Sequence, residues 1–424
     1  MLLPRPLLPV AVAVAGCLPG LAVALLGVHL SPPLAALAAG LAILGSSFLL
    51  LWACDAAQAD ISQALALAVV ALIAVLPEYA VDMYFTWQAG KFPGGDYSQY
   101  AIANMTGANR LLIGVAWSLV TGLFWFKYRR SVALDPERRT EIAFLVAATV
   151  YALLIPIKGS LMWYDGLVLM GLYGWYIAIA SRRPCVECHV EGPAEYLTGL
   201  PRLKRRLATA VMFAFAAGVI IANAERFCEG LIGTGEALGI SKFLLVQWLA
   251  PLASEAPEFT VAVMFALRGR AGLALGSLLS AKLNQWTLLV GMIPAVFALA
   301  HGSLDHPIPL GELQMSEILL TAAQSLLGVT VLCLLRLSPG HAVLLFTLFA
   351  GQLVAPVAVG ALPRQQLFGL HADQMHSVFS LLYLIATLTL ILDQPRRLAA
   401  MTRGLFAHEP GPTLQEAADE AASA

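Results

Sequence analysis

The sequence predicts an all-α polytopic membrane protein. Of its 424 residues, 59% are hydrophobic and only 12% are charged, and the mean hydropathy is +0.78. A soluble domain cannot bury that much apolar surface. Apolar stretches of roughly 20 residues, enough for a helix to cross a hydrocarbon core of about 30 Å, follow one another along the chain. The formal net charge of −1 neither supports nor excludes a nucleic-acid partner, and we expect none.

About twelve of these stretches are predicted to form transmembrane helices. They lie near residues 7–28, 33–53, 62–88, 99–126, 140–157, 161–180, 207–229, 240–267, 271–299, 315–336, 341–361 and 374–393. The first stretch could also be a lipoprotein signal that ends at Cys17. Since polytopic proteins rarely lose their first helix in this way, we expect it to be a span.

The positions of lysine and arginine predict the orientation of the helices. Basic residues gather after the fourth, sixth, eighth, tenth and twelfth stretches, in 127–139, 182–206, 268–270, 336 and 396–403. These loops are two helices apart, so they share one side, and the positive-inside rule makes that side the cytoplasm. The intervening loop 300–314 contains neither lysine nor arginine. Both termini are therefore expected in the cytoplasm, with the helices in the bacterial inner (plasma) membrane.

The helix pattern divides the chain into two similar halves with an extra helix at each end. The predicted parts are an N-terminal helix in 1–32, a first half in 33–180, a basic cytoplasmic loop in 181–206, a second half in 207–361, a C-terminal helix in 362–406 and a tail in 407–424. The tail is acidic and rich in small residues, a composition typical of disorder.

Two helix pairs, near 62–126 and 240–299, share one pattern. The first contains Leu76-Pro77-Glu78 and then AIANMTGANR at 101–110, and the second contains Ala256-Pro257-Glu258 and then ALGSLLSAKL at 274–283. The connection within the first pair is expected outside and that within the second pair inside, so the repeats are inverted. Inverted repeats with broken helices at the midplane are typical of secondary transporters.

Each Pro-Glu step favours a cation site. A proline removes one backbone donor from a helix and frees carbonyl oxygens, which a membrane tolerates only where they line a cavity or bind something. A charge at the centre of a spanning helix costs about 2.5–3.5 kcal/mol on insertion scales. We therefore expect Glu78 and Glu258 to have a function.

These helix pairs resemble the calcium/cation antiporter superfamily, in particular its sodium/calcium exchanger membrane-region family. That family carries two inverted alpha repeats, each with a Thr-Ser-x-Pro-Glu segment and then a Gly-Asn-x-x-Gly-Ser-Asn segment on the next helix. The matching segments here are 74–78 with 103–109, and 254–258 with 276–282. The resemblance implies an exchanger core formed by the second to the eleventh predicted helices.

The resemblance also implies one ion site shared by the two repeats. The expected ion-binding residues are Glu78, Asp82, Asn104, Asn109, Arg110, Ser254, Glu255, Glu258, Ser277 and Lys282. Glu78 and Glu258 are the expected metal ligands, for Ca²⁺ or Na⁺. No cofactor is expected beyond the transported cations Ca²⁺, Na⁺ or H⁺. The lipid bilayer is the other expected partner, and the oligomeric state stays open.

Several departures from the family pattern change the polar groups of this site. The first repeat has Ala74 and Val75 in place of hydroxyl residues, and the second has Glu255 where the family has serine. Lys282 stands where the family has asparagine, and Arg110 follows the last asparagine of the first repeat. Fixed cations oppose a Ca²⁺ site, which needs six to eight oxygen ligands. Lys282 is expected either to replace a bound cation or to exchange a proton during transport.

Structural roles for the charged residues stay open at this point. Glu78 and Glu258 could pair with Arg110 and Lys282 and serve packing alone, although inert packing rarely explains a symmetric placement of Pro-Glu. Asp82 lies one helical turn from Glu78 on the same face, and it could instead reach the outer interface.

The polar residues of the repeats also allow two interpretations. Asn104, Asn109 and Ser277 could be ordinary interhelical hydrogen-bonding residues. The motif around Asn104 favours a ligand role for it. Asn284 and Gln285 are expected to pack rather than to bind ions.

Cys185-Val186-Glu187-Cys188-His189 has the C-x-x-C-H pattern of c-type haem attachment and of half a zinc site. The neighbouring arginines place this loop in the cytoplasm, where haem is not attached, so we expect a plain loop. The other cysteines, which are expected to fill apolar space, are Cys17, Cys54, Cys228 and Cys333. The histidines expected in outer loops, in contact with solvent, are His301, His306, His371 and His376.

The combined prediction is a secondary active cation antiporter and not an enzyme. It would exchange Ca²⁺ or Na⁺ against Na⁺ or H⁺ by alternating access. One alternative is a membrane-embedded redox or metal protein that uses the Cys185, Cys188 and His189 loop. Another is a non-transporting relative that is locked by Lys282 and Arg110.

Overall fold

The structure, a computed structural model, describes residues 5–60, 75–182, 192–360, 362, 366–367 and 369–395. The predicted C-x-x-C-H motif at 185–189, the arginines of 396–403 and the predicted tail at 407–424 lie outside these residues. The four remaining cysteines, at 17, 54, 228 and 333, are buried free thiols, which confirms their packing role.

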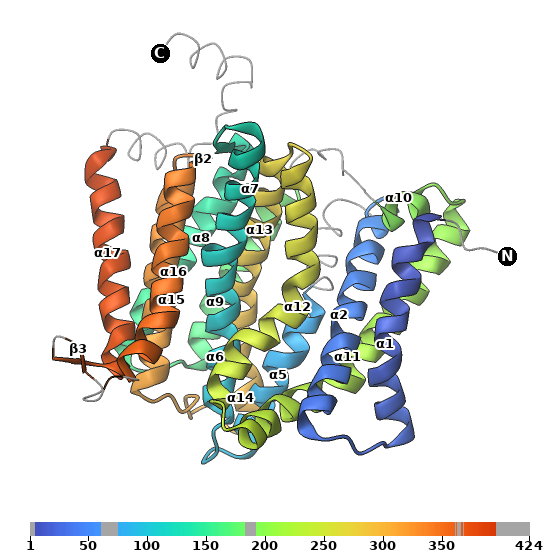
Figure 1. The fold of residues 1–424 in the computed structure, drawn as a ribbon, viewed down its shortest axis with the longest axis horizontal. Helices are drawn as coiled ribbons and strands as arrows, with labels where there is room; N and C mark the ends of the chain where they lie inside the picture. Colours follow the sequence, from blue (N-terminus) through green and yellow to red (C-terminus); the bar gives the residue numbers. More distant parts are fainter. Residues whose placement is uncertain are drawn as a thin grey trace, which may run out of the picture.

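The described chain is almost entirely helical (Figure 1). Its elements are η1 (Arg5–Leu7), α1 (Leu8–Leu26), α2 (Pro32–Ala57), α5 (Leu76–Lys91), α6 (Tyr97–Leu111), η3 (Leu112–Trp117), α7 (Ser118–Tyr128), β1 (Val132–Ala133), η4 (Pro136–Arg138), α8 (Arg139–Lys158), α9 (Trp163–Ala180), α10 (Pro193–Thr198), α11 (Arg202–Leu238), α12 (Lys242–Leu267), α13 (Ala271–Asn284), η5 (Gln285–Leu289), α14 (Val290–His301), α15 (Glu312–Leu332), β2 (Arg336–Leu337), α16 (Pro339–Gly360), β3 (Gln366–Leu367), β4 (Leu370–His371), η6 (Ala372–Gln374) and α17 (Met375–Asp393). The strands form two short antiparallel ladders, β1 with β2 and β3 with β4.

Nine helices of the described chain are long and apolar enough to cross a membrane, counting α6–η3–α7 and α13–η5–α14 as one helix each. Each predicted stretch overlaps a helix, but α5, α9 and α12 are not among the nine. The polytopic all-helical fold is confirmed, and the count of about twelve spans stays a prediction.

The basic loops of the described chain meet at one end of the molecule. Lys127 Nζ and Tyr128 Oη, at the end of α7, donate to the carbonyl of Leu267 at the end of α12 (2.7 and 3.0 Å). The β1–β2 ladder joins the segment after α7 to the segment after α15. Figure 1 shows β2, α10 and the upper end of α7 at this end, whereas β3 lies at the other.

The two helix pairs are inverted in the structure. The turn between α5 and α6 lies at the end opposite to the α7 and α12 termini, because α6, η3 and α7 form one continuous helix. The turn between α12 and α13 lies at the basic end. Each second helix contains a π-helical segment, η3 in the first pair and η5 in the second. Such segments are rare and are frequent at functional sites.

Pro257 does not break the helix that contains it. The helix α12 continues from Lys242 to Leu267 with Pro251 and Pro257 inside it. In a membrane helix, neighbouring helices and side chains can satisfy the backbone groups that a proline frees, so the helix can continue. The departures from α-helical geometry in these pairs lie instead in η3 and η5.

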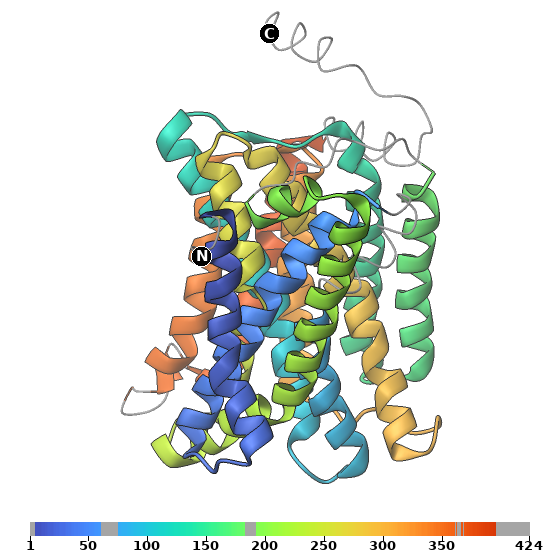
Figure 2. The same cartoon turned by 90° about the vertical axis from the view of Figure 1, so that its right-hand side faces the viewer.

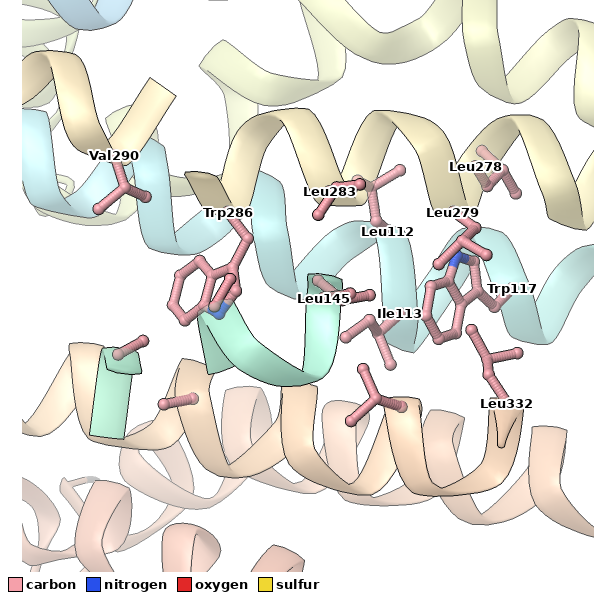
Figure 3. Close-up of a cluster of buried hydrophobic side chains, with 14 of the residues drawn as sticks. Leu112, Ile113, Trp117, Leu145, Leu278, Leu279, Leu283, Trp286, Val290 and Leu332 are labelled. Carbon is pink, nitrogen blue, oxygen red and sulfur yellow. The ribbon is translucent and has the colours of Figure 1, made fainter. Parts of the chain in front are cut away.

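The repeat helices sit between two groups of neighbours (Figures 1 and 2). On one side α2 packs along α1 and α11, and on the other α15 packs against α6, α8 and α17. Figure 3 shows the apolar layer between the second helices of the repeats and α15, with Trp117 and Trp286 pointing into it. Both indole rings are buried. The layer surrounds the polar residues described below with low-dielectric packing.

The closest approach of α6 to α12 occurs at Gly107, and the substitution Gly107→Ala tests it. An added Cβ would lie 1.9 Å from the main-chain oxygen of Gln247 on α12, so the helices would have to separate. We expect unfolding free energy to fall by about 1–3 kcal/mol, as for an overpacked core, measured as a lower melting temperature in detergent. The control is Gly122→Ala on the same continuous helix, where nothing lies within 4 Å. It should melt at or above the wild-type temperature, because alanine favours helix. Equal melting of both variants would contradict the contact.

Candidate ion-binding site

Carboxyl groups from both repeats meet in the centre of the molecule. Glu78 on α5 and Glu255 on α12 are 4% and 2% exposed. Their carboxyl groups lie within electrostatic range of each other. Glu258, one turn along α12, is partly exposed and within electrostatic range of both. Adjacent carboxylates in a buried place repel each other unless protons or a cation offset their charge.

Asp82 and Asn104 extend the same network along the first repeat. The Asn104 side-chain amide donates to Asp82 Oδ1 at 2.8 Å, and both residues are buried. The carboxyl of Asp82 lies within electrostatic range of Glu78. The alternative that Asp82 reaches the outer interface is therefore wrong, because its side chain points into the repeat contact instead.

Several oxygens of this network have no hydrogen-bond partner among the described residues. They are Glu78 Oε1, Asp82 Oδ2, Asn104 Oδ1, Glu255 Oε2 and Gln285 Oε1. Gln285 Nε2 donates to Glu255 Oε1 at 3.0 Å, so Gln285 belongs to the hydrogen-bond network. A buried acceptor without a donor is costly, and a proton or a cation removes that cost. Within the described chain, no group of three or more His, Cys, Asp or Glu side chains is arranged to hold a metal ion in this conformation.

Lys282 lies beside the carboxyl network without an ion pair to any described residue. Its Nζ donates to Asn109 Oδ1 at 2.7 Å and to the Asn109 main-chain oxygen at 3.3 Å. The same atom lies 4.5 Å from the centre of the Trp286 ring and within electrostatic range of Glu255. Two oxygens and an aromatic face suit the three N–H donors of an ammonium group.

Asn109 and Lys282 occupy equivalent positions in the two repeats, and they contact each other. Both come three residues before the π-helical segment of their helix, at η3 and η5. Equivalent residues that touch must lie at the axis that relates the repeats. The fixed charge of Lys282 is therefore held at the centre of the inverted repeat.

Arg110 turns away from the carboxyl network and forms a buried ion pair with Glu317 of α15. Glu317 also interacts with His376 Nε2 of α17 at 3.0 Å, and the Arg110 guanidinium lies over the Trp248 ring. Among the described residues, no ion pair joins Glu78 or Glu258 to Arg110 or Lys282. Pairing of these acids with the two cations, the packing alternative, is not observed.

Sequence reasoning missed Glu317 and placed His376 wrongly. Glu317 is a single charge within an apolar stretch, seven residues before Gln324, whose amide donates to the main-chain oxygen of Arg110 at 3.3 Å. This spacing places both on one helix face and could have revealed the contact. The expectation that His376 is solvated is wrong, since its ring nitrogen faces buried Glu317.

The remaining predicted residues are not part of the network. The Ser254 hydroxyl donates to main-chain oxygens of its own helix, at Ala250 and Pro251. Ser277 is exposed. Asn284 accepts a hydrogen bond from Tyr79 Oη at 2.6 Å, which links the two repeats beside the carboxyl groups.

Comparison with known proteins identifies this architecture. The sequence pattern of the family described as sodium/calcium exchanger protein matches residues 31–182 and 208–358, which contain both helix pairs. The chain belongs to the sodium/calcium exchanger protein family. It is therefore a cation antiporter of the membrane, as the resemblance of the two repeats predicted.

Two solved structures show how far the similarity extends. The H⁺/Ca²⁺ exchanger CAX is 39% identical in sequence, with a TM-score of 0.86 over 95% of this chain and 98% of its own. The sodium-calcium exchanger NCX_Mj is 19% identical, with a TM-score of 0.50 over 82% of this chain and 99% of its own, and it supports the fold alone. No curated protein matches the sequence.

The buried pair of Arg110 and Glu317 predicts a large loss of stability when only one partner is removed. The variant Glu317→Leu leaves the guanidinium buried without its acid, and should lower the free energy of unfolding by about 3–5 kcal/mol. The double variant Arg110→Met/Glu317→Leu should recover much of that loss, because no charge stays unpaired. Melting of the purified proteins in detergent measures both effects.

The control for this pair is Glu312→Leu, at the exposed start of the same helix. Its effect should stay within about 0.5 kcal/mol, as for most surface substitutions. A double variant less stable than Glu317→Leu would show that the pair is not the source of the loss.

Proposed function

We propose that this antiporter exchanges Ca²⁺ for H⁺ at the carboxyl network of Glu78, Asp82, Glu255 and Glu258. The observation that carries the proposal is the set of buried carboxyl oxygens of Glu78, Asp82 and Glu255 that have no hydrogen-bond partner among the described residues. A proton on such an oxygen removes the cost of its missing partner. The same oxygens without the proton are hard anionic ligands of the kind that Ca²⁺ prefers.

Protons and Ca²⁺ compete for the same atoms, and this competition would couple their movements. Entry of Ca²⁺ requires the carboxyl groups to release their protons, and return of the empty carrier requires that protons replace the cation. A site loaded with neither keeps several carboxylates in a low-dielectric place, which is strongly disfavoured. The unpartnered oxygens of Asn104 and Gln285 supply neutral ligands beside the charged ones. The similarity to a protein named as an H⁺/Ca²⁺ exchanger supports the same pair of ions.

Lys282 supports proton coupling rather than sodium coupling. Its ammonium already takes the Asn109 side-chain and main-chain oxygens, which are the kind of ligands that a monovalent cation needs. We propose that Lys282 acts as a built-in cation that offsets one carboxylate in every step of the cycle. Arg110 does not share this role, because its charge is matched by Glu317.

The basic end of the molecule is proposed to face the cytoplasm, following the positive-inside rule. The two inverted repeats would then expose the central site to each side in turn, by alternating access. Glu258, partly exposed where Glu78 and Glu255 are buried, would be the first carboxylate to meet an entering cation.

Neutralising the acids tests the proposed function. Reconstituted wild-type protein should move Ca²⁺ against an imposed pH gradient, measured with Ca²⁺ and pH indicators in proteoliposomes. We expect Glu78→Gln, Glu255→Gln and Glu258→Gln each to slow exchange by about ten- to a hundred-fold, the loss of one charged ligand. Glu225→Gln, an exposed acid on α11, should leave the rate unchanged. Full exchange in all three variants, or flux driven by Na⁺ but not by H⁺, would overturn the proposal.

Replacement of Lys282 tests whether its charge counts in the exchange ratio. Without the ammonium of Lys282, one more negative charge of the carboxylates is left to offset. The Lys282→Asn protein should therefore bind one more monovalent cation for each Ca²⁺ that it moves. We expect a higher H⁺ to Ca²⁺ ratio, or flux that begins to respond to Na⁺, determined from the pH gradient that balances a known Ca²⁺ gradient. Lys204→Asn, an exposed lysine near the start of α11, serves as the control. An unchanged ratio in a folded, active Lys282→Asn protein would contradict the role.

A further inference from the structure

Three arginines converge on a recess at the basic end of the molecule, outside the carboxyl network. Arg129 and Arg130 follow α7, and Arg336 follows α15. Together with Trp125 and Ser131 they line a cavity of about 500 Å³. The short β1–β2 ladder brings the two segments together, since Ala133 pairs with Arg336. Figure 1 shows β2 beside the upper end of α7.

Two residues at or beside this recess have a left-handed backbone conformation, and Arg129 is the residue that ends α7. Arg129 and Leu335 have φ values of 56° and 50°, and they are the non-glycine residues of the described chain with positive φ. Such conformations are uncommon for side chains with a Cβ, and they cluster at ligand-binding places. The Arg129 guanidinium also lies over the Trp125 ring, 4.6 Å from its centre. The arginine is therefore held at the recess rather than moving freely in solvent.

The charge of the recess is not matched by acids of the described chain. Neither Arg129, Arg130 nor Arg336 forms an ion pair there. The other basic cluster at this end differs, because Asp60 accepts hydrogen bonds from Arg205 at 2.6 and 2.9 Å and from Arg206 at 3.2 Å. These arginines lower the pKa of Asp60 to about 2. Among the described residues, this recess therefore combines a cavity with three arginines that form no ion pair with an acid.

We propose that this recess binds the phosphate of an anionic phospholipid headgroup. Guanidinium groups bind phosphate oxygens through paired hydrogen bonds, and basic pockets between helices at the cytoplasmic surface suit such headgroups. The recess lies at the end of the spanning helix α7. There Trp125 and Phe126 are 37% and 72% exposed, as expected for aromatic residues at a membrane interface. Their position lets the acyl chains of a bound lipid lie along α7 while its phosphate meets the arginines.

The test uses the full-length chain, purified and stripped of lipid, in native mass spectrometry. Phosphatidylglycerol should bind, and phosphatidylcholine with the same acyl chains should bind at least about ten-fold more weakly. The variant Arg130→Gln/Arg336→Gln should weaken phosphatidylglycerol binding about ten-fold. The control Arg182→Gln/Lys204→Gln removes the same charge from exposed positions of the basic end, and it should not change the affinity.

Three outcomes would decide against the proposal. Equal binding of the two lipids, or an equal loss of affinity in the control variant, would show that the recess is not a specific site. Inorganic phosphate that binds as tightly as phosphatidylglycerol would overturn the lipid assignment in favour of a free phosphate. The lysine variant Arg130→Lys/Arg336→Lys should retain more binding than the glutamine variant, because it keeps the charge but loses the paired geometry.

Discussion

The rest of the structure depends on the cost of keeping several carboxyl groups together in a low-dielectric interior. Glu78, Asp82 and Glu255 are buried, and they are joined by amides rather than by basic side chains. An amide can donate one hydrogen bond to a carboxylate, but it cannot offset a full charge. One fixed ammonium, that of Lys282, cannot offset three carboxylates, so the rest of the balance must come from ions that enter and leave. A site that is stable only when protons or a cation are bound is the physical requirement for an exchanger.

The two buried basic residues, Arg110 and Lys282, are placed so that neither forms a permanent ion pair with the acids of the site. Arg110 follows Asn109 directly, and in contact with the acids it would neutralise them permanently. Glu317 of α15 prevents this by forming an ion pair with Arg110, and the guanidinium lies over the Trp248 ring. Lys282 is placed differently, since its contacts are neutral oxygens and an aromatic ring. From this distance its charge can weaken the repulsion among the carboxylates. It leaves their oxygens free for ions, which a direct ion pair would not.

The sequence was sufficient for the fold and for the charged part of the site, because intramembrane acids are rare and the repeat has a pattern. Glu78, Asp82, Asn104 and Glu255 were expected together in this way, and the structure brings them together; their role in ion binding stays a prediction. The polar partners were harder to find, since Gln285 and Gln324 look like any helix residue until a neighbour is known. The pairing of Arg110 with Glu317 spans more than two hundred positions of the chain. The effect of Pro257 was misjudged because a proline inside a packed membrane helix does not have to break it.

The position of Lys282 at the repeat axis explains why one lysine can serve both states of the carrier. In an inverted repeat, the two halves exchange their conformations when the site turns from one side of the membrane to the other. A charge far from the axis would approach the acids in one state and leave them in the other, and its field would favour one side. Asn109 and Lys282 contact each other at equivalent positions. In the proposed alternating-access cycle, the ammonium would therefore stay near the carboxyl groups in both states. The fixed charge can then change how many cations are bound without changing which side the site faces.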